Sequence, residues 1–106
     1  MWLATKYGFY SIVKDERQNI FKIRARRKKD LLNLFPENEI YESDHTDYRF
    51  RVIKDQNGLN EFFYKINDID YGNFKGHIAE SPDQSDKLKA YGQIWKAMYD
   101  YQEKQQ

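Results

Sequence analysis

The sequence contains no cysteine, which excludes disulfide bonds, thiolate catalysis and cysteine-ligated zinc. No apolar run approaches the roughly 20 residues that a membrane-spanning helix needs. The first residues also become polar too early for a signal peptide. We therefore expect a cytoplasmic protein that does not enter a membrane.

An excess of one charge is also missing, because 18 basic and 17 acidic residues leave a net charge of +1. The charges are unevenly distributed, since residues 1–54 hold 12 Lys and Arg but only 8 Asp and Glu. Residues 55–106 hold 6 and 9. A dedicated duplex-DNA binder is more basic than this. The asymmetry indicates either an acidic partner for the first half or attraction between the two halves.

The chain does have enough apolar residues for a modest core, with 40% hydrophobic and 17% aromatic residues in a length of 106. That length predicts a single domain over residues 1–106. Apolar and polar patterning predicts strands at residues 2–14, 20–26, 39–42 and 48–54.

Three helices are predicted between and after these strands. The first covers residues 28–35 and stops at Pro36, and the second is capped by Asp55. The third starts near Ser81 and Pro82. The second helix presents an apolar stripe of Leu59, Phe62, Phe63, Ile66 and Ile69. The third presents Leu88, Tyr91, Trp95 and Met98, which we expect to pack on the protein's own sheet rather than on a partner or a second copy.

The order of elements predicts an α+β fold. We expect a four-stranded, mainly antiparallel sheet in ββαββα order, with the helices on one face and an extra C-terminal helix. This is a variant of the ferredoxin-like architecture.

Basic residues alternate with apolar ones in two of the predicted strands. Lys22, Arg24 and Arg26 alternate with Phe21, Ile23 and Ala25, and Arg49 and Arg51 alternate with Tyr48, Phe50 and Val52. Because side chains in a strand alternate between faces, each segment has one core face and one cationic face. The predicted binding residues are therefore Lys22, Arg24, Arg26, Arg49 and Arg51.

Two functions would use these basic residues. The favoured one is a small non-enzymatic binding module that holds an acidic macromolecular surface on the basic face. The alternative is nucleic-acid binding by the same arginines. The basic residues are also compatible with a simply solvated outer face that keeps the sheet soluble.

A third and less favoured function is a small hydrolase of a phosphate-containing substrate. It would depend on His45, which lies between Asp44 and Asp47, or on His77. Neither histidine has a base, nucleophile or metal-ligand partner at a diagnostic spacing. No catalytic residue, metal or cofactor is therefore predicted. A cluster at Asp68, Asp70, Tyr71 and Asn73 is more typical of a turn than of a ligand site.

Several phrases resemble a group of short bacterial and phage proteins of about this length, with no known function. These phrases are KYGFYSIV at 6–13, IRAR at 23–26, DYRFR at 47–51 and IDYGNFK at 69–75. The resemblance implies a bacterial or phage origin and a compact domain. It implies no activity, substrate or catalytic residue.

Overall fold

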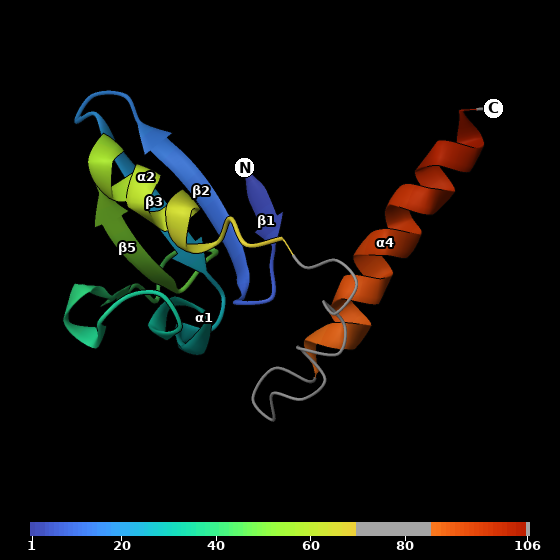
Figure 1. Cartoon of the computed structure of the whole chain (residues 1–106), viewed down its shortest axis with the longest axis horizontal. Helices are drawn as coiled ribbons and strands as arrows, with labels where there is room; N and C mark the ends of the chain where they lie inside the picture. The colour runs from blue at the N-terminus through green and yellow to red at the C-terminus, as the bar shows by residue number, and fades with distance from the viewer. Residues whose placement is uncertain (70–85, 106) are drawn as a thin grey trace. The chain divides into compact units, whose positions relative to one another are not determined.

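The computed structural model describes residues 1–69 and 86–105 (Figure 1). The chain divides into two compact units, residues 1–69 and residues 70–106. The sheet belongs to the first unit, and a long helix belongs to the second. No helix among the described residues is long and apolar enough to cross a membrane. The single domain over residues 1–106 stays a prediction.

A five-stranded antiparallel sheet forms the first unit. Its strands are β1 (Trp2–Ala4), β2 (Phe9–Asp15), β3 (Ile20–Ala25), β4 (Tyr41–Glu42) and β5 (Phe50–Lys54). They lie in the order β1-β2-β3-β5-β4, and all four neighbouring pairs are antiparallel. The α+β class is therefore confirmed, and the ferredoxin-like likeness stays a prediction.

The expected strand over residues 2–14 is two strands joined by a tight turn. The amide of Thr5 donates to the carbonyl of Gly8 at 3.0 Å. The Thr5 hydroxyl accepts hydrogen bonds from the amides of Tyr7 and Gly8 at 3.1 and 3.2 Å. These bonds reverse the chain, since a hydroxyl can replace a ladder partner for nearby amides. The sheet thus has five strands where the sequence predicted four, and the ββαββα order is not confirmed.

The polar break at residues 15–19 forms a hairpin turn between β2 and β3, as expected. The Asp15 carboxylate accepts hydrogen bonds from the amides of Arg17 and Gln18 at 3.0 and 3.4 Å. Asn19 has a φ of 53°, a left-handed conformation that asparagine tolerates better than most residues.

Two helices belong to the first unit. Helix α1 (Lys28–Leu32) is shorter than predicted, and a turn completes the segment with the Phe35 amide donating to the Leu31 carbonyl at 2.8 Å. Helix α2 (Gln56–Lys65) is capped as predicted, because the Asp55 side chain accepts a hydrogen bond from the Gly58 amide at 2.8 Å. Ile69 lies beyond the end of α2 and is 91% exposed, so its predicted place in the stripe is wrong.

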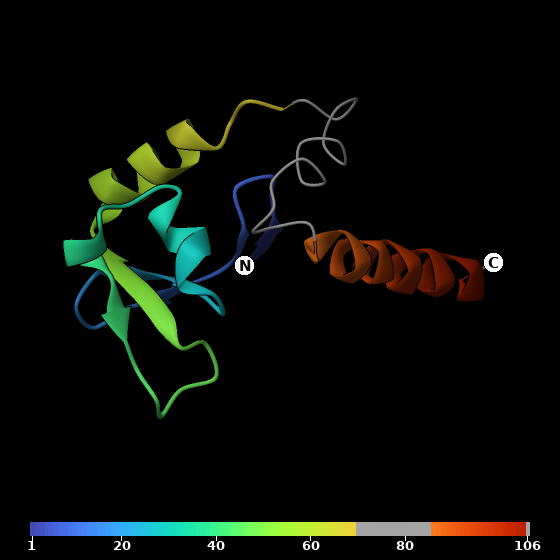
Figure 2. The same ribbon diagram turned by 90° about the horizontal axis from the view of Figure 1, so that it is seen from below.

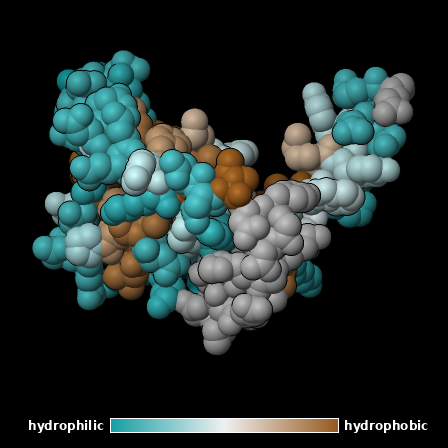
Figure 3. Space-filling model, viewed as in Figure 1, coloured by the Kyte–Doolittle hydropathy of each residue, from teal (hydrophilic) through white to brown (hydrophobic). Residues whose placement is uncertain are grey.

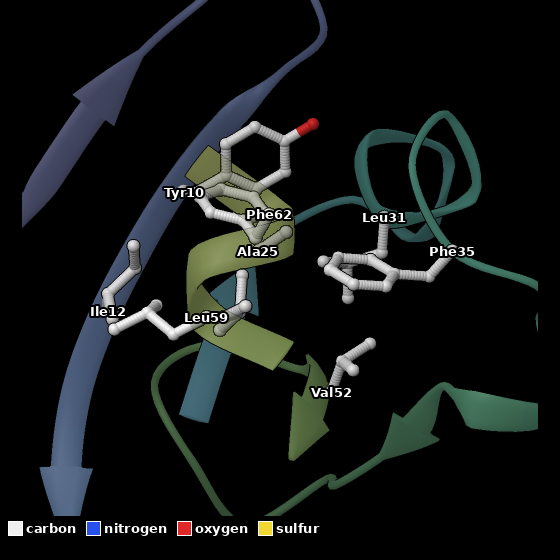
Figure 4. Close-up of a cluster of buried hydrophobic side chains, with 9 residues drawn as sticks. Tyr10, Ile12, Ala25, Leu31, Phe35, Val52, Leu59 and Phe62 are labelled. Atoms are coloured by element: carbon white, nitrogen blue, oxygen red, sulfur yellow. The ribbon is translucent and has the colours of Figure 1, made fainter. Parts of the chain in front are cut away.

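Both helices pack on the same face of the sheet (Figure 2). Figure 4 shows their side chains converging with those of the strands. Phe62 is fully buried, packs edge-on against Tyr10 and stacks on Phe35. The buried cluster comprises Tyr10, Ile12, Ile23, Ala25, Leu31, Phe35, Val52, Leu59 and Phe62. Within residues 1–69, both helices therefore leave the opposite face of the sheet open.

The second unit contains helix α4 (Lys87–Lys104). Its predicted start near Ser81 lies outside the described residues. Trp95 is 64% exposed and stacks on Tyr99 with ring centroids 5.3 Å apart. The expected packing of this helix on the protein's own sheet stays a prediction.

Hydrophilic side chains cover much of the surface that Figure 3 shows, with hydrophobic ones visible between them. This distribution agrees with a sequence that is 33% charged.

Candidate binding face

A row of five residues crosses the whole sheet on the face that α1 and α2 leave open. Strand register pairs Trp2 with Ser11, Ser11 with Arg24 and Arg24 with Arg51, and Arg51 pairs with Tyr41. Directly opposed residues of antiparallel strands point to the same face, so all five side chains share it. The row places two of the predicted arginines at the centre of the sheet.

Arg24 and Arg51 lie directly opposite each other on β3 and β5. Both side chains are half-buried. The Arg24 guanidinium donates from Nη2 to the Ser11 hydroxyl at 2.7 Å, and its Nε is buried without a partner. The Nε of Arg51 is likewise buried and unpaired. In the part of the chain that the structure describes, no carboxylate forms an ion pair with either arginine.

Tyr48 lies beneath the arginines, on the opposite side from where the sequence placed it. The guanidinium carbons of Arg24 and Arg26 lie 4.7 and 4.3 Å from the centroid of the Tyr48 ring. Tyr48 is only 6% exposed but is not a member of the main core cluster. The alternation with Phe50 fails because β5 starts at Phe50, so Tyr48 belongs to the preceding loop. The ring therefore serves as a flat support for two guanidinium groups.

The loop of residues 43–49 supplies further acceptors to the arginines. Arg51 donates from Nη2 to the Thr46 hydroxyl at 2.6 Å and to the Tyr48 carbonyl at 3.0 Å. Arg26 donates from Nη1 to the carbonyl and the carboxylate of Asp47 at 3.2 and 3.3 Å. The predicted basic residues are thus brought together with their own loop.

Arg49 and Lys22 complete the predicted set. The Nε of Arg49 lies 3.8 Å from the Asp44 carboxylate, at the rim of the same loop. Lys22 lies between Val13 and Ile53 in a second row, on the same face as Arg24. We call Lys22, Arg24, Arg26, Arg49 and Arg51 the arginine face.

Exposed apolar side chains flank the arginine face, and the sequence interpretation missed them. Trp2 is 75% exposed at one end of the row, and Tyr41 is 59% exposed at the other. Val13 and Ile53 are also exposed. The missing signal was the register of the strands, which brings these residues to the same face as the arginines.

Of the two histidines that the hydrolase hypothesis requires, the structure describes one. His45 is exposed in the loop of residues 43–49, and His77 lies outside the described residues. Among the residues described, no group of three or more His, Asp or Glu side chains is placed to hold a metal ion.

A second polar cluster ties the end of α2 to the turn between β1 and β2. The Lys6 ammonium lies 2.7 Å from the Asp68 carboxylate, and the Tyr7 hydroxyl donates to both carboxylate oxygens at 2.9 Å. The hydrogen bonds from Lys6 and Tyr7 lower the pKa of Asp68. Burial, together with the hydrogen bond to Asp68, raises the pKa of the Tyr7 hydroxyl. These contacts hold two segments of the first unit together and have a structural role. The neighbouring cluster predicted at Asp70, Tyr71 and Asn73 lies outside the described residues.

Comparison of the chain with protein-family models, with curated proteins and with solved structures found no match. The resemblance to short bacterial and phage proteins therefore stays a prediction, and the function must be argued from the geometry of the arginine face.

Proposed function

We propose that the protein is a non-enzymatic binding module that holds an acidic protein surface on the arginine face. The supporting observation is the direct opposition of Arg24 and Arg51, which have no carboxylate partner among the described residues. Like charges directly opposite each other destabilise a sheet. A partner's carboxylate would relieve this repulsion, and guanidinium groups bind carboxylates in a bidentate geometry.

The surroundings of the arginines favour a protein over a nucleic acid. Exposed Trp2, Tyr41, Val13 and Ile53 offer apolar area on the same face, and Trp, Tyr and Arg are the residues that dominate protein interfaces. Residues 1–69 hold 13 Lys and Arg against 11 Asp and Glu, a weak excess for attracting phosphates.

Binding of a fluorescently labelled polyglutamate peptide, measured by anisotropy at low salt, tests the proposal. Arg24→Gln and Arg51→Gln should each weaken binding by about tenfold, since each removes a charge-assisted contact. Arg17→Gln is the matched control, because Arg17 is exposed in the turn between β2 and β3 and the substitution removes the same charge. Its affinity should stay within about twofold of the wild type. Thermal unfolding of each variant verifies that it is folded.

A labelled single-stranded oligonucleotide distinguishes the alternative partner. Phosphate contacts make affinity fall steeply as salt rises, whereas an interface with apolar groups responds less. Tighter binding of the oligonucleotide than of the peptide, with a steep salt dependence and loss in Arg24→Gln, would replace the proposal with nucleic-acid binding. Absence of peptide binding at low salt would contradict the proposal.

A further inference from the structure

We propose that the loop of residues 43–49 is an internal competitor, which occupies part of the arginine face and is displaced when the acidic partner binds. This inference rests on the proposed function and concerns the regulation of the same site. The loop joins β4 to β5 and extends away from α1 and α2 (Figure 2).

The loop presents the chemistry that an acidic partner would present. The Asp47 carboxylate accepts from Arg26 at 3.3 Å, and the Asp44 carboxylate lies 3.8 Å from Arg49. The Thr46 hydroxyl accepts from Arg51 at 2.6 Å. Two arginines outside the loop, Arg26 and Arg51, are therefore engaged by its oxygen acceptors, and Arg49 is engaged within the loop itself. A partner carboxylate must replace at least some of these contacts to reach the same guanidinium groups.

The charged contacts of the loop are suited to exchange because they are exposed. The side chains of Arg26 and Asp47 are 56% and 75% exposed, and those of Arg49 and Asp44 are 60% and 73% exposed. Exposed ion pairs contribute little to stability, since water competes for both partners. A multivalent acidic surface can therefore replace them at little cost.

The base of the loop is held more firmly than its charged tip. The Ser43 amide donates to the Arg49 carbonyl at 2.7 Å and continues the pairing of β4 with β5. Tyr48 is buried against Arg24 and Arg26. Displacement therefore involves residues 44–47 and leaves the sheet and Tyr48 in place.

This arrangement lowers the apparent affinity for a partner, because only molecules with a displaced loop offer all arginines. Weakening the loop contacts should then strengthen binding. Asp47→Asn keeps the size of the side chain but removes its charge. Thr46→Val removes the hydroxyl that accepts from Arg51 without any change in net charge.

The experiment compares binding of labelled polyglutamate to the wild type, Asp47→Asn, Thr46→Val and Glu42→Gln. Glu42 is an exposed acid on β4, and it controls for loss of a nearby negative charge. We expect Asp47→Asn and Thr46→Val each to bind about threefold more tightly than the wild type, the range set by a surface contact. Glu42→Gln should show a smaller gain than Asp47→Asn.

Two results would overturn the competition by the loop. One is an equal gain in Asp47→Asn and Glu42→Gln, which would show a general effect of charge. The other is unchanged affinity in Thr46→Val. If the wild type binds and either result appears, only the loop proposal fails. If neither the wild type nor Asp47→Asn binds the peptide, the proposed function fails as well.

Discussion

The arginines of the face fall into an inner pair and a rim pair that differ in their partners. Arg24 and Arg51 are half-buried and donate hydrogen bonds to neutral oxygens. Arg24 donates to the Ser11 hydroxyl, and Arg51 donates to the Thr46 hydroxyl of the loop. Arg26 and Arg49 are exposed and lie beside carboxylates. The inner pair retains its full charge for a ligand, whereas the rim pair is partly neutralised. Specific binding should therefore depend most on the inner pair.

The aromatic ring of Tyr48 should contribute to stability through its contacts with two guanidinium groups. Tyr48→Leu keeps an apolar side chain but removes the π face, so it should lower the free energy of unfolding by about 1–2 kcal/mol. Tyr48→Phe retains the ring and should stay within about 0.5 kcal/mol of the wild type. Urea denaturation measures both. An equal loss in the two variants would show that the hydroxyl, rather than the ring, matters.

Period-two alternation predicted the inner pair correctly and Tyr48 wrongly. Arg24 and Arg51 lie within β3 and β5, where alternation applies. Tyr48 precedes β5, and nothing in the sequence DYRFR marks where the strand starts. The partners of the arginines could not be predicted either, because Thr46 and Asp47 reach them through a loop whose path is not encoded by periodicity.

At the scale of elements, the sequence predicted one turn of the sheet correctly and missed another. The hairpin at residues 15–19 was predictable, because a polar run of suitable length separates two apolar segments. The turn at Thr5–Gly8 was not, because it interrupts a continuous run of residues typical of strands. Its geometry depends on the Thr5 hydroxyl and on the close approach of Gly8 to Asp30, which is far from it in the sequence. The propensities of neighbouring residues in the sequence cannot predict such a contact between segments.

Gly8 should be intolerant of any side chain. A Cβ at this position would lie 2.5 and 2.6 Å from Cβ and Cγ of Asp30, which is buried and accepts a hydrogen bond from the Phe9 amide at 3.1 Å. We expect Gly8→Ala to destabilise the first unit by about 2–3 kcal/mol, since the buried, hydrogen-bonded Asp30 cannot move freely. Hydrogen exchange of the sheet amides measures this loss.

Gly92 provides the matched control for Gly8. It lies within α4, and a Cβ there would meet no atom within 4 Å. Gly92→Ala should therefore slow hydrogen exchange in α4, in line with a gain of about 1 kcal/mol in helix propensity. Normal sheet protection in Gly8→Ala would contradict the steric explanation.

At the scale of the whole molecule, the protein has almost no net charge but concentrates basic residues on one surface. The net charge is +1, yet one face of the sheet gathers five basic residues among exposed apolar side chains. Within residues 1–69, α1 and α2 cover the other face and bury the core. This division of the sheet into a core face and a basic face was predictable from alternation. The row that crosses all five strands was not, because it requires the register of each pair.

Amide chemical-shift mapping of the labelled protein with the polyglutamate peptide tests the central claim most directly, because it reports which face the ligand contacts. We expect the largest shifts at Ser11, Arg24 and Arg51 and in residues 44–48, with small shifts in α1 and α2. The shifts should decline in Arg24→Gln and persist in Arg17→Gln. Shifts confined to α1 and α2, or none at low salt, would contradict binding of an acidic protein surface by the arginine face.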